Sequence, residues 1–137
     1  MKNSINPKIW GSSGWIFIHY TALGYPDNPT DEDKKNYKSF FYNLGNTLPC
    51  LKCANNFKKN INELPIDNSL NSRNDLFKWT VNIHNMVNNE LGKNNLSFEE
   101  ALNKYKNTRP SIYDFKNICM CITIILLVLI IIYLFNK

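Results

Sequence analysis

The order of apolar residues and helix breakers is the feature that most limits what this chain folds into. Apolar side chains recur at helical spacing in segments separated by proline, glycine or polar connections. No stretch alternates apolar and polar residues as a half-buried strand does, so we expect an all-α domain. The prediction is a four-helix bundle, a polar connection over residues 65–72 and a short fifth helix opened by a capping box at Ser97 and Glu100. The four main helices are predicted over residues 7–24, 31–47, 49–65 and 73–91.

Two cysteines separated by two residues follow a proline in the run Pro49-Cys50-Leu51-Lys52-Cys53. No breaker occurs until Pro65, which places Pro49 in the first turn of a helix, where its missing N–H is no loss. Cys50 and Cys53 are then also expected in that turn, where unpaired N–H groups and the helix dipole favour a thiolate. The motif alone leaves three interpretations open: a redox dithiol, half of a metal site or a structural disulfide.

Two histidines lie on predicted helices. Trp15 and His19 are four residues apart and share a face, and so do His84 and Asn88. The residues of this segment alone favour a core histidine at position 19, with its ring bonded to a backbone carbonyl. Zinc bound by both cysteines and both histidines is arithmetically possible, but neither histidine has a partner at zinc-finger spacing.

A redox dithiol of the thioredoxin type needs a βαβ setting, which this sequence lacks. In a helical bundle, a dithiol that exchanges electrons needs a cofactor to accept them, because protein side chains offer no acceptor.

The C-terminal run from Ile118 to Phe135 is almost wholly apolar. At about 1.5 Å per residue it gives roughly 27 Å of helix, close to the hydrocarbon thickness of a bilayer. We predict one soluble domain over residues 1–110, a linker over 111–117 and a single transmembrane anchor over 118–135. No secretory signal is visible at the N-terminus. Basic residues before the anchor place the domain on the cytoplasmic side: Lys104, Lys106, Arg109 and Lys116, against Lys137 beyond it.

The charge balance is basic, with 16 Lys and Arg against 11 Asp and Glu. No basic stripe interleaved with aromatic residues occurs, so we predict no nucleic-acid partner and attribute the charge to anionic lipid. A reducing cytosol keeps thiols free, which favours a catalytic or metal-binding role for Cys50 and Cys53 over a structural one. Cys119 and Cys121 enter the predicted anchor, which argues against a four-cysteine zinc site. We predict no metal ligands.

Three segments in this order resemble the Erv/ALR family of FAD-linked sulfhydryl (thiol) oxidases, over about residues 8–106. Two are the dithiol segment Leu48–Cys53 and an entry helix with tryptophan and histidine four residues apart. The third matches the family pattern H-N-x-V-N-x-x-L-G-K. The entry segment reads Trp10-Gly11-Ser12-Ser13-Gly14-Trp15-Ile16-Phe17-Ile18-His19, and the third reads His84-Asn85-Met86-Val87-Asn88-Asn89-Glu90-Leu91-Gly92-Lys93.

The resemblance implies a helical bundle that holds FAD, commonly as a homodimer. Electrons would pass from thiols of a protein substrate to Cys50 and Cys53, then to FAD and to dioxygen, giving hydrogen peroxide. Cys53 would be the thiolate beside the flavin and Cys50 the thiol that exchanges with substrate. Tyr105 falls where the family has a tryptophan against the adenine. The FAD site would comprise Gly11, Trp15, His19, His84, Asn85, Asn88, Leu91, Lys93 and Tyr105.

The sequence departs from the family pattern at three places. Ser12 stands where many members have arginine, and Val81 and Phe98 stand where cellular members often have a structural disulfide. Short members without that disulfide resemble those of large cytoplasmic DNA viruses, which suggests a membrane derived from host endoplasmic reticulum or a virion membrane. No second dithiol precedes the anchor, so a thioredoxin-like or CxxC-bearing relay protein is the expected partner, with Cys119 and Cys121 open as a shuttle pair.

Two classes of function follow. The first is an FAD-dependent thiol oxidase that forms disulfides in protein substrates. The second is a tail-anchored helical adaptor with a structural or metal-binding CxxC motif. Colour separates them, because an FAD enzyme purifies yellow and an adaptor does not.

Overall fold

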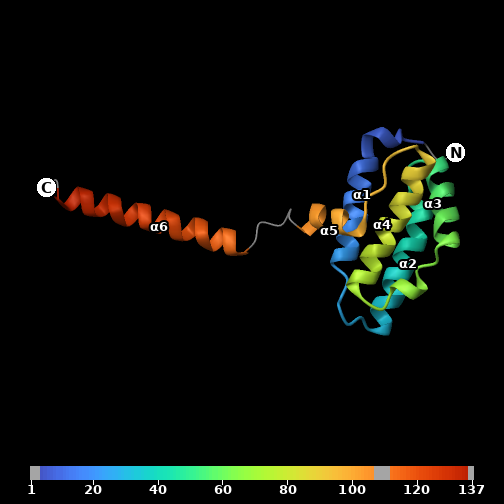
Figure 1. Cartoon of the computed structure of the whole chain (residues 1–137), viewed down its shortest axis with the longest axis horizontal. Helices are drawn as coiled ribbons and strands as arrows, with labels where there is room; N and C mark the ends of the chain where they lie inside the picture. The colour runs from blue at the N-terminus through green and yellow to red at the C-terminus, as the bar shows by residue number, and fades with distance from the viewer. Residues whose placement is uncertain (1–3, 107–111, 136–137) are drawn as a thin grey trace. The chain divides into compact units, whose positions relative to one another are not determined.

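The structure, a computed structural model, describes residues 4–106 and 112–135 of the 137-residue chain. It divides into two units, Met1–Tyr105 and Lys106–Lys137, and each is described by itself. Within the described residues every regular element is helical (Figure 1). The all-α prediction is therefore confirmed.

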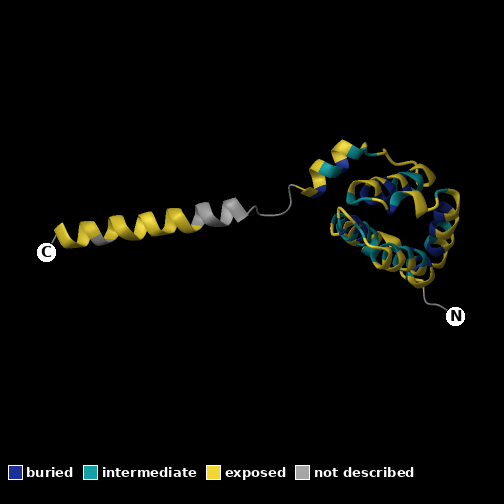
Figure 2. Ribbon diagram, turned by 90° about the horizontal axis from the view of Figure 1, so that it is seen from below, coloured by how far each residue is buried: buried dark blue, intermediate teal, exposed yellow. Residues whose placement is uncertain are grey.

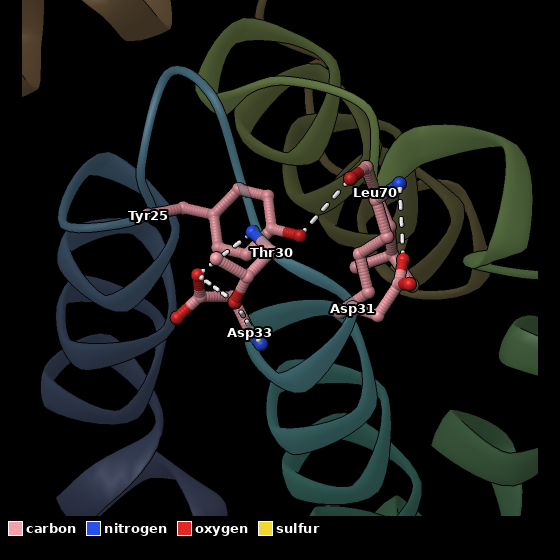
Figure 3. Close-up of polar contacts among 6 residues, drawn as sticks. Tyr25, Thr30, Asp31, Asp33 and Leu70 are labelled. Carbon is pink, nitrogen blue, oxygen red and sulfur yellow. Dashed lines mark hydrogen bonds and ion pairs between the residues drawn. The ribbon is translucent and has the colours of Figure 1, made fainter.

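Two helices begin at the residues that the sequence predicts. Helix α1 spans Pro7–Leu23, with proline in its first turn. Helix α2 spans Asp31–Thr47. Its N-cap Thr30 accepts the Asp33 N–H at 3.1 Å, while the Asp33 carboxylate accepts the Thr30 N–H at 2.9 Å (Figure 3). This reciprocal pair satisfies backbone donors that a helix start leaves unpaired.

Helix α3 begins later than the sequence predicts. It spans Leu51–Glu63, so Pro49 lies outside it and Cys50 is its N-cap. The backbone of Cys50 is extended, with φ −143° and ψ 113°, and its Sγ accepts the Cys53 N–H at 3.1 Å. The sulfur takes the place of the usual capping oxygen. Placing Cys50 within the first turn was therefore wrong, whereas Cys53 does lie there.

Helix α4, Arg73–Glu90, packs against both α1 and α3. Because it has neighbours on several sides, its buried residues are not confined to one face: they are Leu76, Phe77, Trp79, Thr80, Val81, Ile83 and Asn88. Leu91 lies just past the helix and is 61% exposed. The helix ends within one residue of the predicted end at 91, and Gly92 adopts φ 64°, a conformation that suits glycine.

The connection between α3 and α4 was predicted as polar, but it contributes two apolar side chains to the core. It contains the 3₁₀ turn η1, Asp67–Ser69, flanked by Ile66 and Leu70. Both apolar side chains are buried in the core. The buried Tyr25 hydroxyl donates to the Leu70 carbonyl at 3.0 Å and joins this connection to the end of α1 (Figure 3).

Helix α5, Phe98–Lys106, begins at the predicted capping box. The Ser97 N–H donates to the Glu100 carboxylate at 2.7 Å, and the Glu100 N–H donates to the Ser97 hydroxyl at 3.2 Å. Ala101 and Tyr105 are the buried residues of this helix. The capping box therefore fixes the start of the helix that carries Tyr105.

The second unit contains helix α6, Ile112–Phe135, which begins inside the predicted linker 111–117. The side chains described along it are exposed, including those from Ile122 to Leu129 (Figure 2). Within the described residues, no helix meets both the length and the apolarity that crossing a membrane requires. The predicted anchor over 118–135 is thus not supported and stays a prediction. The predicted domain boundary at residue 110 lies outside the described residues.

Candidate functional site

A cluster of rings forms where α1, α4 and α5 meet. The Trp15 and His84 rings stack with centroids 3.9 Å apart and an angle of 6° between their planes. The His19 ring lies 4.6 Å from the Tyr105 ring and 5.6 Å from the Phe77 ring. Trp15, His19, His84 and Tyr105, four of the predicted cofactor residues, therefore gather in one place. We call these four residues the ring cluster.

A line of hydrogen bonds runs through the ring cluster. His19 Nε2 lies 2.9 Å from His84 Nδ1, and His19 Nδ1 lies 3.0 Å from the Thr80 hydroxyl. The Thr80 hydroxyl donates to the Phe77 carbonyl at 2.7 Å. Both ring nitrogens of His19, which is 1% exposed, thus have partners. His19 is therefore bonded to side chains and not to a backbone carbonyl, and its role in a cofactor site stays a prediction.

Both histidines are held neutral. Burial, then the charges of His84 and Lys104, lower the pKa of His19 from 6.5 to about 3. Burial, then the charges of Lys104 and Lys93, lower the pKa of His84 to about 4. At neutral pH each imidazole therefore carries one N–H donor and one bare nitrogen acceptor. Lys93 and Lys104 are close enough to act on these rings electrostatically.

Helix α3 begins at the end of the bundle where α1 begins and α4 ends (Figure 1), and the dithiol lies at this start of α3. Cys50 and Cys53 form a disulfide, and Cys50 is 5% exposed while Cys53 is half-buried. The Ile5 N–H donates to the Pro49 carbonyl at 2.6 Å. Asn56, one turn along α3, donates to Glu90 at the end of α4 at 2.6 Å. The dithiol is therefore fixed against both chain segments.

Five further predicted cofactor residues are not members of the ring cluster: Gly11, Asn85, Asn88, Leu91 and Lys93. Asn85 holds the loop before α5, donating to the Leu96 carbonyl at 2.7 Å and accepting its N–H at 3.0 Å. Asn88 donates to the Asn94 carbonyl at 3.2 Å, and its own carbonyl accepts the Lys93 N–H. Gly11 has no neighbouring atom within 4 Å of the position of a Cβ. With the exposed Leu91, these residues remain predictions as cofactor contacts.

Sequence reasoning missed the role of Thr80. Thr80 is not among the predicted site residues, yet its hydroxyl is hydrogen-bonded to His19. The spacing of Thr80 and His84, four residues apart on one helix, is the signal that could have indicated it. Phe77 and Lys104 were also missed. For metals, the described residues contain no group of three or more His, Cys, Asp or Glu arranged to hold an ion.

Comparison with known proteins agrees with this geometry. The sequence profile of the Erv1 / Alr family matches residues 12–108, which include the dithiol and the whole ring cluster. The chain belongs to the Erv1/Alr family. The resemblance drawn from three sequence motifs is therefore confirmed.

Viral and cellular members of the Erv1/Alr family are both similar to this chain. A probable FAD-linked sulfhydryl oxidase of Acanthamoeba polyphaga mimivirus is 46% identical over 105 residues, covering 76% of this chain and 73% of that protein. The mitochondrial FAD-linked sulfhydryl oxidase of Saccharomyces cerevisiae is 37% identical over 83 residues, covering 61% of this chain and 43% of that protein.

Solved structures of the Erv1/Alr family share this fold. The yeast Erv1 core superposes with a TM-score of 0.71 at 30% identity, covering 78% of this chain and 89% of that chain. The FAD binding domain of Erv1 from Saccharomyces cerevisiae gives the same TM-score and covers 77% of this chain and 98% of that chain. The Erv1 core is thus an all-helical unit of the same architecture.

Proposed function

We propose that this protein is an FAD-dependent sulfhydryl oxidase that forms disulfides in thiol-containing protein substrates. The observation that carries the proposal is the combination, in one bundle, of a disulfide at a helix N-terminus with a cluster of planar rings. Membership of the Erv1/Alr family, and relatives named as FAD-linked sulfhydryl oxidases, support it.

The residues of the ring cluster fit FAD. Near-parallel aromatic rings such as those of Trp15 and His84 stack well on planar heterocycles. Three of the four histidine ring nitrogens are already paired within the protein, which leaves Nε2 of His84 to hydrogen-bond the group. Lys93 and Lys104 supply positive charge that suits a pyrophosphate. Trp15, His19, His84 and Tyr105 would hold the group, and when bound it would accept two electrons from the dithiol and pass them to dioxygen, giving hydrogen peroxide.

The dithiol performs the exchange with substrate. A substrate thiolate attacks Cys50 Sγ, the Cys50–Cys53 bond breaks, and Cys53 leaves as a thiolate. Its place in the first turn of α3 stabilises that negative charge. A second substrate thiolate then attacks the substrate sulfur of the mixed disulfide, which gives a substrate disulfide and the reduced pair. The assignment of Cys50 to substrate and Cys53 to flavin is part of this proposal.

The visible spectrum of the purified full-length protein tests the proposed oxidase. We expect a flavin band that bleaches when dithiothreitol is added without air and recovers as oxygen is admitted and consumed. A flavin band that never bleaches would contradict electron transfer from the dithiol. A folded, colourless protein would favour the alternative, a tail-anchored adaptor with a structural or metal-binding CxxC.

We propose that the protein is a homodimer that uses the outer face of α1. Within the first unit, α1 exposes three large apolar side chains: Ile9, Ile16 and Phe17 are 76%, 45% and 58% exposed. Residues 9 and 16 are seven apart and share a face. Phe17 lies edge-on to Phe40 of α2, beside a hollow lined by Thr21, Asn36, Tyr37 and Phe40.

We also propose that the C-terminal segment associates with a membrane and that the first unit faces the cytoplasm. The support is the apolar composition and exposure of α6 and the excess of Lys and Arg before it. Host membrane derived from endoplasmic reticulum and virion membrane are the candidates. Flotation of the full chain with anionic vesicles tests the proposal, and a chain ending at residue 110 that floats equally well would contradict it.

The immediate protein partner is proposed to be a thioredoxin-like or CxxC-bearing relay protein, because the described free cysteines lie only in α6. In a Cys53→Ser variant the Cys50 thiolate can attack the disulfide of an oxidised CxxC partner; the partner's S–S bond breaks, one of its cysteines leaves as a thiolate, and a mixed disulfide with Cys50 remains. With the disulfide form of a small CxxC protein we expect a covalent adduct, which dithiothreitol should release. The Cys-to-Ser form of that small protein should give no adduct.

A further inference from the structure

Thr80 occupies a position in α4 where packing alone would accept an apolar side chain. It is fully buried, at 0% exposed. Its hydroxyl has two partners: it donates to the Phe77 carbonyl at 2.7 Å and lies 3.0 Å from His19 Nδ1. The first bond is the common local bond of a helical threonine to the preceding turn. The second bond connects α4 to α1 and is the one that requires an explanation.

The direction of each bond follows from the number of protons available. A hydroxyl has one proton, and Thr80 gives it to the Phe77 carbonyl, which can only accept. The Thr80 oxygen must therefore accept from His19, so Nδ1 of His19 carries the N–H. In a neutral imidazole Nε2 is then bare, and it accepts from Nδ1 of His84 at 2.9 Å. His84 in turn has a bare Nε2.

The geometry points to Thr80 as a positioning residue of the candidate cofactor site: its hydroxyl fixes the tautomer of His19 and, through it, that of His84. The result is a ring cluster in which the remaining nitrogen of His84, Nε2, is a hydrogen-bond acceptor. The inference rests on the proposed FAD-binding function for its role in binding, but the tautomers themselves do not depend on it.

Loss of the Thr80 hydroxyl exchanges donor and acceptor in the hydrogen bond between His19 and His84. In a Thr80→Val variant, His19 Nδ1 has no acceptor and an N–H there would be buried unpaired, which is unfavourable. His19 then takes the other tautomer and donates from Nε2 to Nδ1 of His84. The proton of His84 moves to Nε2, so the acceptor becomes a donor. A hydrogen bond from the cofactor to this nitrogen would be replaced by a clash between two donors.

The test uses ¹⁵N-histidine labelling of the full-length protein as purified. The chain has only two histidines, so four ring-nitrogen signals report both tautomers. We expect Nε2 of His84 to be unprotonated in the wild type and in Thr80→Ser, and protonated in Thr80→Val. The dissociation constant of FAD, from the fluorescence of released flavin, should rise roughly tenfold in Thr80→Val, the scale of one buried hydrogen bond, and be restored by Thr80→Ser.

Each contrary outcome has a definite meaning. Unchanged ring-nitrogen signals in Thr80→Val, or failure of Thr80→Ser to restore them, would overturn the tautomer assignment. Reversed tautomers with an unchanged FAD dissociation constant would overturn the role in binding. A wild type that binds no FAD would defeat the proposed function, and the ¹⁵N signals would still decide the tautomers. Thr80→Ala supplies a second hydroxyl-free variant if Thr80→Val does not fold.

Discussion

His19 and His84 are 65 positions apart in the chain, yet their rings are joined by one hydrogen bond of 2.9 Å. The bond links α1 to α4, and the Trp15 ring stacks on the His84 ring at 3.9 Å. Since burial keeps both histidines neutral, this pair makes the stability of the fold depend on pH.

We expect the free energy of unfolding to fall as pH drops from about 6.5 towards 4. In the folded protein the pKa values of His19 and His84 are lowered to about 3 and about 4. In the unfolded chain both protonate near pH 6.5. Above 6.5 both states are neutral, whereas below it only the unfolded state binds protons and becomes favoured. Each histidine contributes a slope of at most about 1.4 kcal/mol per pH unit.

Urea unfolding between pH 7.5 and 5 measures this slope. The pKa values of the Asp33 and Glu100 carboxylates are lowered from 3.8 and 4.5, so both stay ionised in the folded protein over most of this window. A His84→Gln variant should show a smaller slope. Constant stability from pH 7.5 to 5 in the wild type would contradict the prediction.

Replacing either cysteine of the dithiol should abolish thiol oxidation while leaving FAD bound. Cys50→Ser and Cys53→Ser each remove the disulfide but no member of the ring cluster. Oxygen consumption with dithiothreitol measures activity, and the flavin absorbance per protein measures occupancy. Cys119→Ser provides the matched control, with activity expected to stay near that of the wild type. Substantial activity in either dithiol variant would refute the mechanism.

Trp79→Phe should destabilise the fold by about 1–3 kcal/mol, because it leaves the part-buried Leu64 carbonyl without its donor. The Trp79 side chain is 2% exposed, and its Nε1–H donates to the Leu64 carbonyl at 2.8 Å. Trp10→Phe is the control: its Nε1–H donates to the Ile5 carbonyl at 3.3 Å in a more exposed setting, so a loss below about 1 kcal/mol is expected. Equal losses in urea unfolding would contradict the distinction.

Phe17→Glu should shift the protein from dimer to monomer, because it places a charge in the apolar face of α1. Analytical ultracentrifugation of the detergent-solubilised full chain measures the shift. Asn55→Glu adds the same charge at an exposed position of α3 and should leave the dimer intact. A wild-type monomer, or a dimer unaffected by Phe17→Glu, would rule out this face as the interface.

Local signals predicted the helices well because their physical causes lie within a few residues. Thr30 with Asp33, and Ser97 with Glu100, satisfy backbone donors three positions away, and Gly92 alone permits the turn that ends α4. The start of α3 was predicted wrongly at Cys50, although the contact that fixes it is equally local. There a sulfur rather than an oxygen caps the helix.

The sequence by itself determined the order of the helices, the dithiol and the family, because each depends on short runs of contiguous residues. Only the tertiary structure decided that Ile66 and Leu70 are core, that Asn85 holds a loop and that Thr80 meets His19. Those contacts depend on which helices pack together. A threonine on a helical face is bonded to a distant histidine only when α1 is packed against α4, and no local pattern encodes that packing.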